Sequence, residues 1–141
     1  EEVTLFTIKD WLKSNPTRMD EILSKNPSYV FFELKDAQAD GPVGSLNVTL
    51  TPERSIAVDR NVIPLGAPVW LQTTLPNAQQ SPLNKLMLAQ DTGGAIKGHI
   101  RADVFWGRGD EAEKMAGLMK QQGKLFVLLP KGYSIKKNQT H

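Results

Sequence analysis

Apolar residues near the start of the chain recur every three or four positions, the spacing of a helix with one buried face. Leu5, Ile8, Trp11 and Leu12 follow this pattern, and the pair Asn15-Pro16 ends it. The residue before a proline is biased away from helical backbone, so a helix usually stops there. We therefore predict a first helix that begins near Leu5 and stops at this pair.

A second helical run follows the proline and carries Met19, Ile22 and Leu23. Thr17 precedes this run, and acidic residues stand three and four positions after it, an arrangement that resembles a helix cap. The pair Asn26-Pro27 closes the run. The sequence thus predicts a second short helix capped by Thr17.

From Tyr29 onward the apolar runs become short and rich in β-branched and aromatic residues, which is typical of strands. Glycine, proline, asparagine and aspartate separate them. The runs are YVFFEL (29–34), VGSLNVTL (43–50), SIAVD (55–59), APVWLQTTL (67–75), LMLAQ (86–90), ADVFW (102–106) and LFVLL (125–129). Six or seven strands favour a mainly β fold, a small closed barrel with a helical appendage.

One helix interrupts the strands, and we expect it over residues 110–122. Its apolar face repeats at helical spacing: Ala112, Met115, Ala116 and Met119. Acidic residues stand at the favoured N-terminal end, and Gly123 follows the last turn. Methionine commonly fills gaps in cores, so this face is interpreted as core packing.

Composition narrows the function classes. The 141 residues are enough for one domain with a core, and a net charge of +2 is too small to indicate a nucleic-acid partner. Cysteine is absent, which excludes disulfides and thiolate chemistry. Only His99 and His141 could supply imidazole, so we expect no zinc site, no other metal and no cofactor.

No apolar run approaches the length of a membrane span, and no signal peptide is visible. The chain opens on Glu1-Glu2 without an initiator Met, with a helical pattern under way by Leu5. We therefore expect a piece of a longer polypeptide whose targeting segment lies elsewhere.

Candidate chemistry is densest in QDTGGAIKGHIRADVFWG, residues 90–107, where Asp91 and Asp103 flank a glycine-rich turn. Asp59 stands at the end of the SIAVD run in a similar position. An aspartate at a strand end often caps a turn through its side chain. Three of them are less easily explained in that way, because strand ends gather at the rims of a barrel. Turn capping and a carboxylate site at the barrel mouth both remain open.

Glycines in this stretch point to close backbone approach. Gly93 and Gly94 suit either a tight turn or a bulky ligand. GGAIKG lacks the spacing of a P-loop and of a dinucleotide fingerprint, so a nucleotide site is not indicated. Lys97 could pair with an anionic group of a ligand or simply solvate the turn.

The residues around Asp103 bear on its chemistry. Arg101 shares a strand face with Asp103 if the two residues alternate around Ala102. Trp106 lies close in sequence, and an exposed tryptophan beside an acid often holds a sugar ring, although a core position is about as common. No serine partner for His99 is evident, so a serine–histidine–aspartate triad is not indicated.

The blocks SIAVDRNVIPLGAPVW, QDTGGAIKG and RADVFWGRGDEA resemble the three-aspartate domain, whose acids would here be Asp59, Asp91 and Asp103. With NPSYVFF and GKLFVLLPKG, the chain is similar to the C-terminal part of the membrane-bound lytic transglycosylase A family of bacterial peptidoglycan-cleaving enzymes. This resemblance implies a six-stranded double-psi β-barrel over residues 29–132. Residues 1–28 would be the helical end of a second domain, and residues 133–141 a flexible tail.

The same resemblance implies roles for single residues. Asp103 would be the catalytic acid, and Asp91 would lie beside it in the cleft. Asp59, Gly93, Gly94, Lys97 and Trp106 would contribute to substrate binding. The partners implied are peptidoglycan glycan strands and an absent N-terminal portion that forms the second wall of the groove. Family members are lipid-anchored to the outer membrane and act in the periplasm.

The implied reaction needs one leading carboxylate. Asp103 would protonate the oxygen between N-acetylmuramic acid and N-acetylglucosamine and then accept the C6 hydroxyl proton, which yields a 1,6-anhydro product. A free aspartate has a pKa of about 3.9, so we expect burial near aromatic residues and the Asp91 carboxylate to raise the pKa of Asp103. Two alternatives are a glycan-binding barrel without catalysis and an inverting hydrolase that uses Asp91 and Asp103.

Overall fold

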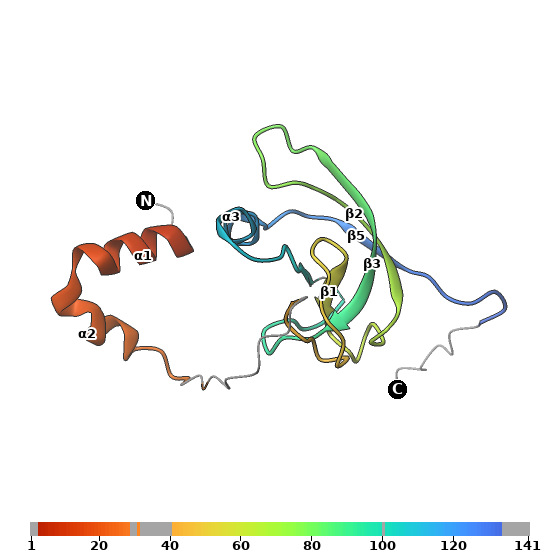
Figure 1. The fold of residues 1–141 in the computed structure, drawn as a ribbon, viewed down its shortest axis with the longest axis horizontal. Coiled ribbons are helices and arrows are strands. Elements are labelled where there is room, and N and C mark those ends of the chain that lie inside the picture. Colours follow the sequence, from red (N-terminus) through yellow and green to blue (C-terminus); the bar gives the residue numbers. More distant parts are fainter. Residues whose placement is uncertain (1–2, 29–30, 32–40, 100, 134–141) are drawn as a thin grey trace, which may run out of the picture. The chain divides into compact units, whose positions relative to one another are not determined.

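The computed structural model describes residues 3–28, 31, 41–99 and 101–133. The chain forms two compact units, Glu1–Ala39 and Asp40–His141, and each is treated by itself. Figure 1 colours the helices of the first unit red to orange and the sheet of the second unit yellow to blue. No helix in the described ranges is long and apolar enough to cross a bilayer.

The first helix of the helical unit is confirmed. α1 spans Leu5–Ser14, and Asn15 is its C-cap. The start is set by Thr4, which the sequence pattern had not indicated. Its hydroxyl accepts from the Thr7 backbone N–H, and the Thr7 side chain accepts from the Thr4 backbone N–H, which satisfies two otherwise unpaired donors.

The cap predicted for the second helix is wrong. Pro16–Arg18 forms a short 3₁₀ helix (η1) that contains Thr17, and α2 follows at Met19–Leu23. An N-cap needs extended backbone, and a residue already in helical conformation cannot supply it. Arg18 precedes α2 without a side-chain cap, and its guanidinium instead pairs with Glu21 at 3.0 Å.

The second unit contains one sheet of five strands in the order β4-β1-β3-β2-β5. The strands are β1 (Ser55–Val58), β2 (Pro68–Thr74), β3 (Pro82–Asp91), β4 (Ala102–Val104) and β5 (Lys124–Val127). β1 runs parallel to β3, and the other neighbouring pairs are antiparallel. Figure 1 shows that the long strands β2 and β3 curve strongly, so the sheet forms half of a barrel.

One face of this sheet carries the core. Alternate residues of the strands point into it, as a period of two requires. Its fully or almost fully buried members are Ile56, Val58, Ile63, Val69, Leu71, Leu83, Met87 and Ala89. The opposite side of β1 carries Ala57, which is only half buried and becomes important for the site.

Five of the predicted strands are confirmed in position, and the run at 43–50 is not a strand. Val43 and Thr49 form only an isolated bridge, and the residues between them turn back on themselves. Asn47 adopts a φ of 60°, and its N–H donates to the Gly44 carbonyl, which closes the turn. Apolar alternation suggested a strand here, but long-range contacts of this turn decide its shape.

The run YVFFEL lies outside the described residues except for Phe31, which is not in a strand and is 86% exposed. Within the described residues β4 and β5 are the two sheet edges, so these five strands do not close on themselves. A mainly β architecture with three helices is therefore what the structure establishes.

The helix after β4 is shorter than predicted. α3 spans Asp110–Leu118 and begins after Gly109, whose φ is 86°. The prediction of helix as far as Gln122 is wrong, because Met119 already has extended backbone with ψ of 108°. Met119 packs against the sheet core, so the interpretation of the methionine face as packing is confirmed for this residue.

Candidate active site

Asp91 and Asp103 lie on the two strands that flank β1, and both have Ala57 as their partner across the sheet. Directly opposed residues project from the same face of a sheet. Asp91 and Asp103 therefore project on the side of Ala57, away from the core residues Ile56 and Val58. Their Cα atoms are two strand spacings apart, about 10 Å.

A bulge in β3 produces this arrangement. Ile56 pairs with Ala89, whereas Ala57 pairs with Asp91, so β3 contains one extra residue, Gln90. Unbroken alternation would have placed Gln90 opposite Ala57 and Asp91 opposite the buried Val58. Bulges commonly redirect a side chain in this way. The extra residue is held in place because Gln90 Oε1 accepts from the buried Ser55 hydroxyl at 2.5 Å.

The Asp91 carboxylate is held by the turn that precedes β1. Asp91 Oδ1 accepts from the Ser45 backbone N–H and from the Ser45 hydroxyl, both at 3.0 Å. The same hydroxyl lies 2.7 Å from Thr92 Oγ1. Close approach depends on Gly44, because a Cβ there would stand 2.5 Å from the Gln90 carbonyl oxygen. The sequence did not indicate Ser45, since nothing local marks a turn residue 46 positions from its partner.

Both carboxylate oxygens of Asp59 accept hydrogen bonds from residues of nearby turns. Oδ1 accepts from the backbone N–H and the side-chain amide of Asn61, both at 3.0 Å. Oδ2 accepts from the Gly98 N–H at 2.9 Å, at a residue whose φ of 81° favours glycine. The backbone hydrogen bonds from Gly98 and then Asn61 lower the pKa of Asp59, and the charge of Lys97 adds to this effect. This geometry favours turn capping for Asp59.

Asp103 forms a two-pronged ion pair with Arg101. Nε donates to Oδ1 and Nη2 to Oδ2, both at 2.9 Å. Asp103 raises the pKa of the Arg101 guanidinium, first by this hydrogen bonding and then by its charge. The predicted shared face is thus confirmed. The burial that we expected for the Asp103 carboxyl is not found, because its side chain is 47% exposed.

We call residues 92–98 the glycine loop. Each of the three aspartates either adjoins this loop in the sequence or is linked to it by hydrogen bonds. Asp91 immediately precedes the loop and is fixed by Ser45, and Asp59 accepts from the N–H of Gly98 at the loop's far end. Asp103 reaches the middle through Arg101, whose Nη1 donates to the Ala95 carbonyl at 3.2 Å. Two of the acids thus reach the loop through hydrogen bonds, Asp59 directly and Asp103 by way of Arg101, whereas the Asp91 carboxylate is bound by Ser45.

Asp103 and Trp106 share a surface hollow of about 540 Å³ beside the end of α3. Arg101, Lys120 and Gln121 supply its other polar side chains. Trp106 is half buried and packs partly against the core, so it combines both roles considered for it. The hollow can therefore offer a sugar-sized ligand an aromatic face and a carboxylate together.

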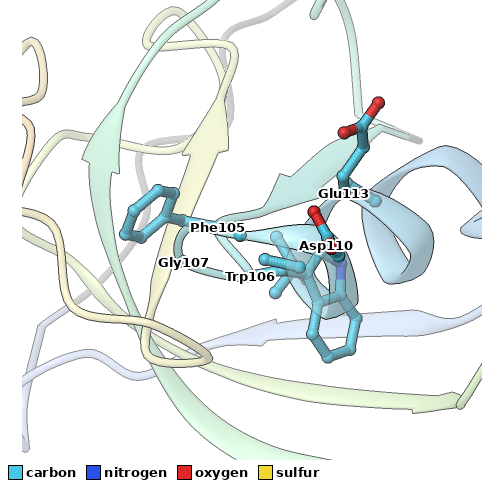
Figure 2. A pocket seen from close by; sticks show the side chains of 9 residues that line it. Phe105, Trp106, Gly107, Asp110 and Glu113 are labelled. Atoms are coloured by element: carbon cyan, nitrogen blue, oxygen red, sulfur yellow. The ribbon is translucent and has the colours of Figure 1, made fainter.

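Trp106 also borders a second hollow of about 320 Å³, between the end of β4 and α3. Phe105, Trp106 and Gly107 line it together with Asp110 and Glu113 of α3, and Figure 2 shows the Trp106 ring beside Asp110. Trp106 thus separates two depressions on this side of the sheet.

A third hollow, of about 240 Å³, lies against the glycine loop. Asp59, Gly93, Gly94 and Lys97 line it, and neither Asp91 nor Asp103 does. The structure thus groups six of the predicted residues in two places, the loop hollow and the Asp103–Trp106 hollow, and Asp91 lines neither of them. Among the residues that the structure describes, no three acids or histidines are grouped as metal ligands would be.

Models of known protein families match both the helical unit and the sheet unit of the chain. The model of the 3D domain matches residues 54–129, and the model of the MltA specific insert domain matches residues 1–33. The first covers more than half of the chain and includes all three aspartates.

Known proteins resemble the chain over most of its length. Membrane-bound lytic murein transglycosylase A of Vibrio cholerae is 36% identical over 91% of this chain and 35% of its own length. The crystal structure of MltA from Neisseria gonorrhoeae superposes with a TM-score of 0.77 at 47% identity, over 90% of this chain and 32% of that one. E. coli MltA with bound chitohexaose gives 0.75 at 32% identity, over 85% and 37%. The chain thus spans about a third of the length of these relatives.

Proposed function

We propose that this chain forms the catalytic part of a peptidoglycan lytic transglycosylase. The reason is that it belongs to the 3D domain family and to the lytic transglycosylases A that carry this domain. The substrate is the β-1,4 bond between N-acetylmuramic acid and N-acetylglucosamine, and the product is a 1,6-anhydromuropeptide. The observation that carries the proposal is that Asp103, at the position implied for the catalytic acid, shares a hollow with Trp106. The chitohexaose bound to the E. coli relative supports an oligosaccharide ligand.

In this mechanism Asp103 acts twice. Its carboxyl first gives a proton to the glycosidic oxygen, the bond from that oxygen to C1 of the muramic residue breaks, and N-acetylglucosamine leaves as the alcohol. The resulting carboxylate then removes the proton from the C6 hydroxyl while O6 bonds to C1. The carboxyl ends protonated, and no water is consumed. Two-carboxylate glycosidases differ because they need a second carboxylate, which either activates a water molecule or acts as the nucleophile.

Asp91 has a supporting part in this proposal. Its carboxylate projects on the face of Asp103 and is fixed by two hydrogen bonds from Ser45. A fixed negative charge about 10 Å from Asp103 can stabilise positive charge that develops at C1 between the two side chains. Trp106 packs against a sugar ring, and Gly93, Gly94 and Lys97 contact the glycan farther along the loop hollow. Asp59 shapes that hollow by holding Gly98.

The wider architecture is part of the same proposal. The five-stranded half barrel becomes a six-stranded double-psi barrel when a further strand completes it. A second domain supplies the other wall of the groove, and the full-length protein works in the periplasm as an outer-membrane lipoprotein. The matching insert-domain segment at residues 1–33 supports the second domain.

A glycan-binding module without catalysis is the second candidate, and one observation favours it. The Asp103 carboxylate is already bound by two guanidinium hydrogen bonds and is half exposed, without the burial that we expected for the catalytic acid. In a binding module, Asn at position 103 would retain function.

The two candidates are separated by Asp103→Asn in the full-length protein, with murein sacculi as substrate. General acid–base catalysis contributes about 10²–10⁴-fold, so turnover falls by that order while binding to sacculi persists. Asp10→Asn, an exposed aspartate of α1, is the matched control and leaves turnover unchanged. The wild-type product is one water lighter than a hydrolysis product by mass spectrometry. Unchanged turnover in Asp103→Asn contradicts the acid role of Asp103, absence of turnover in the wild type with retained binding favours the binding module, and reducing-end products indicate a hydrolase.

A further inference from the structure

Arg101 connects the candidate acid Asp103 to the glycine loop. The mechanism proposed for Asp103 and Asp91 does not involve this connection. Three of its guanidinium nitrogens donate hydrogen bonds in one plane. Two contact the carboxylate oxygens of Asp103 and one contacts the Ala95 carbonyl. Arginine is the side chain suited to such a fork, because its donors are rigidly arranged and it stays charged.

We propose that Arg101 is a positioning residue that links the charge of Asp103 to the conformation of the glycine loop, an inference that rests on the proposed role of Asp103 as the acid. When Asp103 is ionised, both of its oxygens bind the guanidinium, and the third contact fixes the loop at Ala95. When Asp103 carries a proton, one oxygen becomes a donor and the carboxyl loses the negative charge that holds it to the fork. The pair then opens, and the protonated oxygen becomes available to a glycosidic oxygen.

This link fits the two halves of the reaction. Before proton donation the open pair leaves the Asp103 hydroxyl and the loop free to adapt to a glycan. After donation the new carboxylate regains its partner Arg101, which offsets the negative charge that the transfer creates. Return of the C6 hydroxyl proton to Asp103 opens the pair again. The guanidinium neither gains nor loses a proton in either step.

Other charged groups near Asp103 are placed differently. Lys120, which follows α3, lines the same hollow, and Asp91 projects from β3 on the far side of Ala57. Among the hydrogen bonds of the described residues, Asp103 Oδ1 and Oδ2 accept only from Arg101. Removal of Arg101 therefore acts on Asp103 directly, while Lys120 and Asp91 are the same in the wild type and in the variant.

The first test observes the link without catalysis, by NMR on the 141-residue chain. The carboxyl carbon of Asp103 and the amides of residues 95 and 96 are followed as pH is lowered. In the wild type the loop amides shift with the same midpoint as the carboxyl. In Arg101→Ala the loop amides no longer follow the carboxyl, because the side chain that joins Asp103 to Ala95 is gone.

Two further variants complete this test. Arg101→Lys keeps the charge but loses the fork, so the loop amides stop following the carboxyl. Arg108→Ala removes an exposed cation five residues after Asp103 and leaves both readouts unchanged. Loop amides that track Asp103 equally well in Arg101→Ala would overturn the proposal.

The second test measures turnover of murein against pH in the full-length protein. In Arg101→Ala the pH profile changes shape, and turnover at the optimum falls by about tenfold to a hundredfold, as expected for a misplaced catalytic group. A pH profile that superposes on the wild type, or a loss explained by a lower Tm, counts against a positioning role. Turnover that survives Asp103→Asn would instead refute the proposed function, whatever Arg101→Ala shows.

Discussion

Asp91 and Asp103, which are separated by a glycine loop in the sequence, lie opposite the same residue, Ala57, from the two strands on either side of it. This relationship depends on the single extra residue in β3. It turns Asp91 from the core face to the face of Asp103, and so the two carboxylates border the same side of β1. The predictions below test the elements that maintain this arrangement.

The bulge should depend on the buried hydroxyl of Ser55. This hydroxyl donates to Gln90 Oε1 and accepts from the Thr51 N–H at 2.8 Å, and Ser55 is fully buried. Ser55→Ala leaves a donor and an acceptor without partners, so the free energy of unfolding falls by about 1–3 kcal/mol in chemical denaturation. Ser81→Ala removes a hydroxyl from an exposed hydrogen bond with Asn77 and costs much less. Equal losses in the two variants would contradict a structural role for the bulge contact.

Asp91→Asn should reduce murein turnover, but by less than Asp103→Asn does. Asparagine can still accept one hydrogen bond from Ser45 through its amide oxygen, whereas the negative charge is lost. Ser45→Ala is the companion variant, because it removes the hydroxyl and keeps the charge of Asp91. We expect the largest loss in Asp103→Asn, then Asp91→Asn, then Ser45→Ala, with turnover measured on sacculi. A loss in Asp91→Asn as large as that in Asp103→Asn would move the acid role toward Asp91.

Asp59 should make the stability of the sheet unit dependent on pH. Hydrogen bonds from Gly98 and Asn61 lower its pKa below the ordinary value of 3.8, so the ionised form is favoured by folding. That contribution is fully present above pH 3.8 and is lost as the pH falls through the lower folded-state pKa. Thermal unfolding followed down through this window should therefore show a steeper fall in Tm for the wild type than for Asp59→Asn. Parallel curves would show that Asp59 contributes nothing to this dependence.

The two adjacent glycines of the loop should respond differently to alanine. A Cβ at Gly93 would stand 2.8 Å from the Cδ1 atom of the buried Ile96, whereas a Cβ at Gly94 would meet nothing within 4 Å. Gly93→Ala should cost about 1–3 kcal/mol of stability by overpacking. Gly94→Ala should leave the Tm unchanged and weaken binding to sacculi, because the methyl group projects into the space proposed for the glycan. Unchanged binding in Gly94→Ala would place the glycan away from this loop.

Local pattern was sufficient for the elements whose stability depends on their own residues. Helical spacing located α1, strand-like runs located β1, β2 and β5, and the aspartate blocks pointed to the chemistry. These features could be predicted because side-chain period and turn residues act over a few positions. The same local reasoning placed a strand at 43–50, where alternation is present but Gly44 is drawn against Gln90 by contacts that no neighbouring residue reveals.

The sequence alone therefore determined that the chain contains a helical start, a β-rich body and three aspartates at the ends of strand-like runs. Only the tertiary structure decided what each carboxylate faces. Asp59 accepts hydrogen bonds from Asn61 and Gly98. The bulge directs Asp91 toward Ser45, and Arg101 binds Asp103. The physical reason is that hydrogen-bond partners and strand register are set across long separations, such as the 46 residues between Ser45 and Asp91, where the pattern of neighbouring side chains carries no information.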